Sequence, residues 1–477
     1  MEFTGRAADL ALLDSRLRLV AEGRGPSRGT AVVVTGRRRV GKSRLVQEFC
    51  DRSGLPYVIF QATRGRNPAA ERADFTASIA QSTLPGGGLV ADTRPQDWNH
   101  ALRTLVAAVP GDTPSIAVID EVPWIVEQDT EFEGALQTVW DRELSARPVM
   151  LILVGSDLSV MEALTTYGRP FFGRAAKMTV RPLNLGDVAA MTGLSAADAV
   201  DAALLTGGFP EIVQSWPPGA SPADFLRESV ANPLSPLLAA GELTVLGEFP
   251  GTTLTRAVLE AIGSGERTVS AIAAHAGGGE PLASGTLAPV IRALVGKGVV
   301  AADMPLSMKA DTKNKRYRIA DTYLRCWLAL LVDAIPLIER GRPDLALARI
   351  ERALPSWRGR AVEPLIRESL LRLLPEAGWP QTGAVGGWWN RQNKPEIDLV
   401  GADRRPVASQ VHFVGSVKWY ENKPFTSRDY DDLTHDATAV PGATPGTPLV
   451  AVSRTGFADG LPLAAQWGPD DLLHAWQ

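Results

Sequence analysis

Short apolar runs alternate with amphipathic segments along residues 1–182. Runs of strand type lie at 31–35, 57–60, 115–119 and 149–154, and the intervals between them are long enough for helices. Ahead of the first run, leucines and a valine recur at spacings of three and four, which predicts an amphipathic helix over residues 1–20. Strands that alternate with helices predict a parallel sheet covered on both faces.

The pattern changes at residue 183, where the chain becomes helical and rich in alanine. Helical segments at 254–263, 268–276 and 284–296 precede two short strands at 299–304 and 316–319, and this is the order of a winged helix. Connecting helices are expected over 321–354. A final helix at 361–374 and strands at 397–400, 407–413 and 449–453 predict a last α/β unit.

Composition excludes several classes of protein. The 477 residues are 45% hydrophobic and 21% charged, so the chain is long and apolar enough to fold into several domains. The net charge of −4 excludes a uniformly basic protein but leaves room for a basic patch. Two cysteines and five scattered histidines predict neither a disulfide framework nor a metal site built from these residues. We find no signal-peptide pattern or membrane-length apolar stretch, and expect a soluble, cytoplasmic protein.

A glycine-rich motif follows the first apolar run. Residues 36–43 read GRRRVGKS and match the Walker A pattern GxxxxGK[ST], with a strand before them and a helix expected at 44–50. Main-chain N–H groups and the helix N-terminus would surround phosphate, while Lys42 would contact the β- and γ-phosphates and Ser43 would bind Mg²⁺. The alternative is a chance glycine turn. The predicted nucleotide contacts are Gly36, Arg37, Arg38, Arg39, Val40, Gly41, Lys42, Ser43 and Arg44.

A second motif supports the first. The run at 115–119 ends in Asp120 and Glu121, a Walker B pattern in which the aspartate would hold Mg²⁺ through water and the glutamate would polarise the attacking water. An acidic turn at a strand end is the simpler alternative. The run at 149–154 is followed by Ser156, which we expect to contact the attacking water or the γ-phosphate.

These motifs occur in a recognisable order, together with residues 3–10, 167–174 and 181–183 and with Gly207-Gly208-Phe209-Pro210. In this order the chain resembles the archaeal-type members of the STAND P-loop ATPases, which are relatives of the AAA+ class. The resemblance implies that Gly208 and Pro210 lie close to the nucleotide and couple a helical lid to its state. It also implies that Arg174 senses the γ-phosphate, although a surface ion pair is an equal alternative for this arginine.

The segment 292–318 carries seven basic residues against two acidic ones. Lysines at the tip of a winged helix commonly contact phosphates, and the helix at 284–296 would enter the major groove of DNA, although few of its side chains can read bases. Winged helices also bind proteins, and that alternative stays open. The predicted DNA contacts are Lys309, Lys313, Lys315 and Arg316.

The last unit resembles the restriction-endonuclease fold, PD-(D/E)XK. In that pattern Asp398 and Lys418 stand at the active site, and the position two before the lysine should be acidic but is Ser416. A hydroxyl replaces a carboxylate poorly on a hard divalent ion, so we predict an inactive nuclease site. Glu396 and Glu363 are the residues that would restore the missing charge.

The expected fold class is therefore α/β in five parts. They are a P-loop NTPase core with a parallel sheet at 1–182, a helical lid at 183–248, a winged helix at 249–320, connecting helices at 321–355 and a restriction-endonuclease-like domain at 356–477. The leading hypothesis is a switch that hydrolyses ATP with Mg²⁺ and acts on DNA. An ATP-gated Mg²⁺-dependent DNA nuclease in defence or repair and a nucleotide-binding interaction scaffold are the alternatives. Protein partners and an oligomer are compatible with each, and no membrane is involved.

Overall fold

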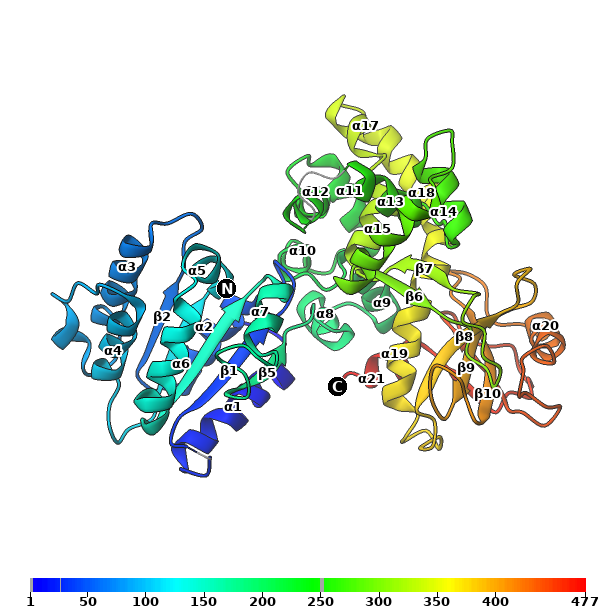
Figure 1. Cartoon of the computed structure of the whole chain (residues 1–477). Coiled ribbons are helices and arrows are strands. Elements are labelled where there is room, and N and C mark those ends of the chain that lie inside the picture. The colour runs from blue at the N-terminus through cyan, green and yellow to red at the C-terminus, as the bar shows by residue number, and fades with distance from the viewer. Residues whose placement is uncertain (1–2, 26, 249–252) are drawn as a thin grey trace. The chain divides into compact units, whose positions relative to one another are not determined.

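The computed structural model describes residues 3–25, 27–248 and 253–477, the side chain of Glu248 excepted. The chain divides into two compact units, Met1–Pro182 and Leu183–Gln477, which are described separately (Figure 1). Residues 1–2 at the start of the first predicted helix, and 249–252 at the start of the predicted winged helix, lie outside the described residues.

The first unit is built on a five-stranded parallel sheet. Its strands are β1 (Thr30–Thr35), β2 (Tyr57–Gln61), β3 (Ser115–Asp120), β4 (Val149–Gly155) and β5 (Ala175–Thr179). They lie in the order β2-β3-β4-β1-β5, and every neighbouring pair is parallel. Strand β4 is therefore inserted between β1 and β3. Because the three strands are parallel, their carboxyl ends lie side by side at one edge of the sheet.

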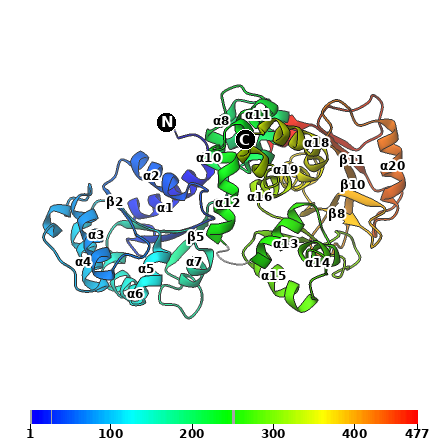
Figure 2. The same ribbon diagram turned by 90° about the horizontal axis from the view of Figure 1, so that it is seen from above.

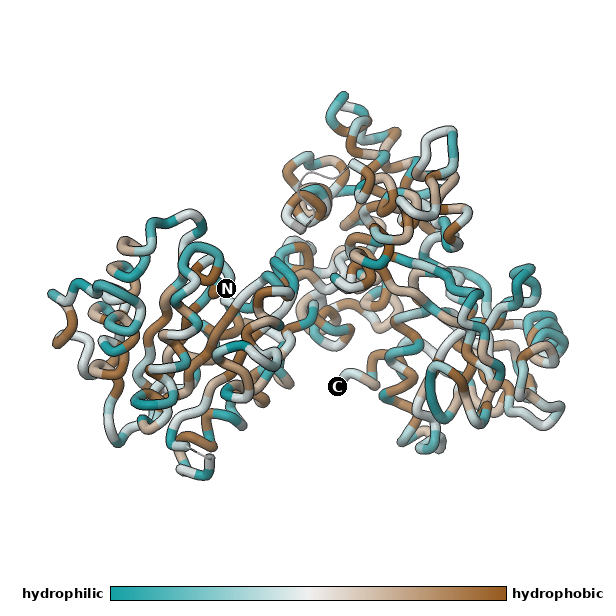
Figure 3. The backbone as a smooth tube through the Cα atoms, viewed as in Figure 1, coloured by the Kyte–Doolittle hydropathy of each residue, from teal (hydrophilic) through white to brown (hydrophobic). Residues whose placement is uncertain are grey.

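Helices cover both faces of this sheet, as the two views show (Figures 1 and 2). One face packs against α1 (Ala7–Ala21) and α2 (Lys42–Ser53). The other packs against α3 (Pro68–Ala80), α4 (Trp98–Ala108), α5 (Val122–Gln128), α6 (Phe132–Arg142) and α7 (Leu158–Leu164). Every residue of β3 and β4 is buried, and the apolar colour follows these strands through the middle of the unit (Figure 3). The predicted parallel sheet with two covered faces is confirmed.

The sequence pattern missed the fifth strand. Strand β5 reads AAKMT and buries only Met178 fully, because it lies at the edge of the sheet and pairs with β1 alone. An edge strand with one covered side has no continuous apolar run, which is the signal used for the other four.

The second unit begins with helices and ends with a mixed sheet. Its helices are α8 (Leu185–Thr192), α9 (Ala196–Thr206), α10 (Pro210–Gln214), α11 (Pro222–Ala231), α12 (Pro236–Glu248), α13 (Thr253–Gly263), α14 (Val269–Ala276), α15 (Ser284–Gly296), α16 (Thr322–Cys326), α17 (Ile335–Glu339), α18 (Pro343–Ala361), α19 (Glu363–Leu373), α20 (Ser427–Ala437) and α21 (Pro469–His474). One continuous apolar core runs through this unit, from Leu183 to Leu472. Among the described residues no single helix is long and apolar enough to cross a membrane, and α8 with α9 meets that criterion only as a pair bent by 108°.

Three helices and a two-stranded antiparallel sheet follow one another in the predicted winged-helix order. Helices α13, α14 and α15 precede β6 (Val300–Asp303) and β7 (Arg316–Ile319), which pair from Val300 with Ile319 to Asp303 with Arg316. The segment that joins the two strands does not stand free, since the main-chain N–H of Leu306 donates to the carbonyl of Gly387 at 2.9 Å.

The C-terminal sheet has the order β12-β11-β10-β9-β8. The strands are β8 (Ala384–Trp389), β9 (Glu396–Ala402), β10 (Val411–Lys418), β11 (Leu449–Ser453) and β12 (Ala465–Trp467). Helix α19 packs on one face and α20 on the other. Strand β10 begins four residues later than predicted and ends five residues later, because 407–410 are irregular and precede it. Strand β8 was missed because its Gly386-Gly387 pair weakens the strand pattern.

Candidate functional site

The P-loop joins the end of β1 to the start of α2. Gly36 has a φ of 153°, and a Cβ atom there would lie 2.4 Å from the carbonyl oxygen of Val180, so only glycine fits. Gly41 has a φ of 87° and stands directly before α2. Loops with glycines in these conformations before a helix can direct main-chain N–H groups and the helix N-terminus toward a phosphate.

Lys42 is buried within this loop. Its Nζ atom donates to the main-chain carbonyl oxygens of Gly36 and Arg37, at 2.9 Å each. Burial lowers the pKa of Lys42 to about 8, and the charge of Arg38 acts in the same direction, while Glu121 and Asp120 raise it. The residues present therefore fit a nucleotide, since Lys42 would contact its phosphates and Ser43 and Asp120 would hold Mg²⁺.

This lowered pKa predicts that ATP affinity depends on pH. The free site loses its proton as the pH rises through about 8, whereas a phosphate-bound Lys42 keeps it, so binding takes up a proton. We expect the dissociation constant to be level below about pH 7 and to rise above pH 8 toward roughly tenfold per pH unit. Calorimetric titrations with ATP at pH 7, 8 and 9, in buffers of different ionisation enthalpy, measure both quantities. A level affinity to pH 9 would contradict this account of Lys42.

Strand register brings the Walker B residues to the same edge as the P-loop. Thr35 of β1 lies opposite Gly155 of β4, and β4 in turn pairs with β3. Asp120 is buried and accepts the N–H of Glu121 at 2.8 Å, and the Ser156 hydroxyl donates to Oε1 of Glu121 at 3.1 Å. Glu121 has a φ of 54° and stands directly before α5. The structure therefore brings Lys42, Asp120, Glu121 and Ser156 to one edge of the sheet.

Arg6 is a site residue that the sequence pattern did not identify. Its buried guanidinium donates to the carbonyl oxygen of Val40 in the P-loop, to the carbonyl of Arg181 at 2.9 Å and to Asp9 at 2.9 Å. It joins the segment before α1, the P-loop and the end of the unit. Arg6 lies in the segment 3–10, which carries part of the family resemblance, but its role is defined by contacts with residues distant in sequence.

Arg174 forms an ion pair with Asp141, with two hydrogen bonds of 2.7 Å, and this pairing lowers the pKa of the aspartate. The alternative of a surface ion pair describes this geometry, and a γ-phosphate contact remains a prediction.

Gly208 and Pro210 lie in the second unit. Gly208 has a φ of 70°, and a Cβ atom there would meet the carbonyl oxygen of Leu183 at 2.1 Å, so packing within this unit explains the glycine.

The basic segment separates into exposed and buried parts. Lys309, Lys313 and Lys315 are exposed, and none forms an ion pair with a carboxylate of the described chain. Arg316 is buried and bonded to both carboxylate oxygens of Glu396, and its guanidinium lies 4.3 Å from the ring centre of Trp389. In this structure Arg316 does not present its charge to DNA, because a carboxylate from the C-terminal sheet already neutralises it.

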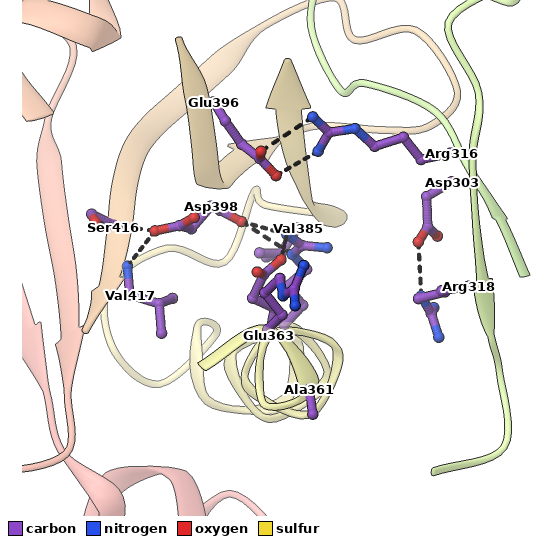
Figure 4. Close-up of polar contacts among 12 residues, drawn as sticks. Asp303, Arg316, Arg318, Ala361, Glu363, Val385, Glu396, Asp398, Ser416 and Val417 are labelled. Atoms are coloured by element: carbon purple, nitrogen blue, oxygen red, sulfur yellow. Dashed lines mark hydrogen bonds and ion pairs between the residues drawn. The ribbon is translucent and has the colours of Figure 1, made fainter. Parts of the chain in front are cut away.

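The predicted nuclease residues gather around β9, β10 and α19 (Figure 4). Asp398 accepts the Ser416 hydroxyl at 3.1 Å and the Val417 N–H at 2.8 Å. Glu363 points toward Asp398 from α19, and burial raises the pKa of both carboxyl groups. The Nζ atom of Lys418 forms an ion pair with Asp429 at 3.5 Å.

A guanidinium stands among these carboxylates. Arg367 donates to Glu363 at 2.7 Å and to the carbonyl oxygen of Asp398 at 2.8 Å. Glu396, a candidate for restoring the metal charge, is bound to Arg316 and Arg267 instead. Within the described residues, no group of three His, Cys, Asp or Glu side chains has the geometry to hold a metal ion. In this structure arginine side chains therefore provide the positive charge beside Glu363 and Glu396.

We expect no Mg²⁺-dependent DNA cleavage by this protein, with or without ATP. Ser416→Glu alone leaves Arg367 among the carboxylates and is expected to stay inactive. Ser416→Glu with Arg367→Gln removes the competing charge and is the variant in which we expect cleavage. Nicking of supercoiled plasmid measures both variants, and Asp398→Ala added to the double variant is the control. Cleavage by the unmodified protein that disappears in Asp398→Ala would contradict the prediction.

The chain is similar to several known proteins in sequence or in fold. Residues 327–430 match a family described as "Archaea bacterial proteins of unknown function". The chain is 23% identical over 414 residues to an uncharacterized protein of Methanocaldococcus jannaschii, covering 85% of each. Among solved structures it resembles the Walker-type ATPase of Pyrococcus abyssi, with a TM-score of 0.50, 17% identity and coverage of 69% of this chain and 98% of that one. A lower TM-score of 0.44 relates it to the ORC2 protein of Aeropyrum pernix in its ADPNP-ADP complexes, at 14% identity, covering 71% of this chain and 95% of that one.

The parallel sheet, the P-loop after its first strand and the similarity to a Walker-type ATPase define the fold of the first unit as that of a P-loop NTPase. The second unit adds the helical segment, the α13–β7 segment and the C-terminal α/β sheet, so the chain as a whole is of mixed α/β class.

Proposed function

We propose that the protein is an ATP-hydrolysing switch of the STAND and AAA+ type that acts on DNA. The observation that carries this proposal is the insertion of β4 between β1 and β3, which aligns Ser156 and Glu121 with the P-loop. Glu121 is the general base for the attacking water, and Ser156 orients it. Turnover of Mg²⁺-ATP, measured with and without duplex DNA, tests the proposal directly.

The second unit has the connections that a switch needs to transmit a change. Asp201 of α9, in the predicted lid, is buried and accepts hydrogen bonds from Arg358 at 3.0 Å, Arg454 at 3.1 Å and the Trp419 indole at 3.1 Å. Arg454 and Trp419 follow strands of the C-terminal sheet. A lid displaced by nucleotide would carry this sheet with it, because separating the pairs would leave buried charges unpaired.

DNA contact is proposed for the exposed lysines of the segment between β6 and β7. This segment is held against the C-terminal sheet, since the Asn314 side chain and the Trp389 indole exchange hydrogen bonds of 3.2 Å with each other's main-chain carbonyls. Three exposed lysines on a segment held in place suit contacts to phosphates, which give affinity without reading sequence. The switch would therefore act on DNA without sequence preference.

We expect a salt dependence that reflects three phosphate contacts. With Lys309, Lys313 and Lys315 bound, log K should fall with log salt at a slope near −2.7. Lys313→Ala with Lys315→Ala should weaken binding to all sequences alike and flatten the slope by roughly 1.8. Fluorescence anisotropy on two unrelated duplexes over a KCl series measures the slopes.

The matched control is Arg340→Ala with Arg352→Ala, which removes two exposed charges outside this segment. Equal slopes for the two double variants would exclude the lysine segment as the DNA-binding surface and favour the protein-binding alternative.

A further inference from the structure

Two cavities of the second unit share a set of arginine side chains. The larger, of about 270 Å³, is lined by Arg267, Arg318, Arg325 and Arg360 and has no carboxylate in its wall. The smaller, of about 50 Å³, is lined by the same four arginines together with acidic residues. The arginines come from the segment before α14, from β7, from α16 and from the end of α18, so folding of this unit assembles the cluster.

Only two of these four charges are balanced by an ion pair. Arg267 pairs with Glu396 at 3.2 Å and Arg318 with Asp303 at 2.7 Å, both toward the smaller cavity. Arg325 donates to the main-chain carbonyl of Arg360 at 3.0 Å. Within the described part of the chain, neither Arg325 nor Arg360 has a carboxylate within 4.0 Å. The larger cavity therefore carries an excess of positive charge.

The guanidinium groups of Arg267, Arg318 and Arg360 lie close enough to Arg325 to repel its charge. Burial lowers the pKa of Arg325 to about 10, and the charges of Arg318, Arg267 and Arg360 act in the same direction, against the single opposing effect of Glu363. An anion in the larger cavity would relieve this repulsion, and guanidinium groups match phosphate oxygens through paired hydrogen bonds.

The remaining wall suits a small organic anion. The side chain of Trp357 lines the larger cavity. Ile262 and Leu330 add apolar surface. Converging charges and an apolar wall are features of a ligand pocket.

We propose that this cavity binds the phosphate group of a small molecule. The ligand would contact Arg267 and Arg318 of the predicted winged helix and Arg325 and Arg360 of the helices that lead to the C-terminal sheet, and so connect the two parts. The site lies in the second unit and does not depend on ATP hydrolysis at the P-loop.

The test uses full-length protein with Lys42→Ala as the common background, so that the P-loop contributes little to phosphate binding. Inorganic phosphate and AMP are titrated separately by calorimetry. Arg360→Ala removes an exposed arginine whose main-chain contact to Arg325 survives, and Arg352→Ala removes an exposed arginine of the same helix that does not line the cavity. We expect Arg360→Ala to weaken binding about tenfold or more, and Arg352→Ala to leave it unchanged.

The two probes distinguish the source of the phosphate. If AMP binds more tightly than inorganic phosphate, the site is assigned to an organic phosphate. If the two probes bind with the same affinity, it is assigned to the free ion. Both results support a phosphate site. Equal affinities of the two arginine variants for both probes would overturn the proposal. A loss of duplex DNA binding in Arg360→Ala with unchanged phosphate and AMP binding would also overturn it and assign the arginines to DNA.

Discussion

Replacing Glu121 by glutamine should slow ATP hydrolysis by about 10²- to 10⁴-fold and leave ATP binding unchanged, because a general base contributes that much. Glutamine keeps the size of the side chain and an oxygen that can accept the Ser156 hydroxyl, which lies 3.1 Å from Oε1 of Glu121. It loses only the ability to take a proton from water. Single-turnover hydrolysis and calorimetric ATP binding separate the two effects.

Glu127→Gln is the matched control, since Glu127 is exposed on α5, the helix that begins directly after Glu121. It makes the same chemical change outside the site, and we expect wild-type turnover. If Glu121→Gln hydrolyses ATP at the wild-type rate, another group activates the water, and the assignment of Glu121 as the general base is wrong.

The first unit was predictable from the sequence because its signals are local. Strands β1, β3 and β4 are buried almost throughout, and β2 is an apolar run with two buried residues. The P-loop follows β1 and the acidic pair stands at the end of β3, so each motif is identified by the strand beside it in sequence. The order of the strands was not predictable, and neither was the hydrogen bond between Ser156 and Glu121. Both depend on β4 pairing with β1 and β3 across long crossovers.

The second unit was less predictable, because its chemistry depends on pairings between distant segments. Arg316 reads as one of several basic residues in a predicted wing, but it pairs with Glu396, 80 residues later. Glu363 and Asp398 were selected by resemblance, whereas Arg367, which donates to Glu363 and to the Asp398 carbonyl, was not. Nothing in a local pattern distinguishes an arginine paired with a buried carboxylate from one on a helix surface.

Replacing Lys42 by alanine should abolish useful ATP affinity, because losing one partner of a buried charge pair costs about 2–5 kcal/mol. That corresponds to a roughly 30- to 5,000-fold rise in the dissociation constant. Lys42 also donates to the carbonyl oxygens of Gly36 and Arg37, so its loss removes two restraints on the loop as well as a charge. Calorimetric titration with ATP and a thermal unfolding curve measure binding and folding independently.

Lys177→Ala is the control for this change, since Lys177 is an exposed lysine on β5 of the same unit. It should bind ATP as the wild type does. Lys42→Ala should also lose the decline of affinity above pH 8, because the titrating group is gone. A folded Lys42→Ala protein that binds ATP with wild-type affinity would exclude the P-loop as the nucleotide site, and Glu121 would then have no phosphate beside it on which to act.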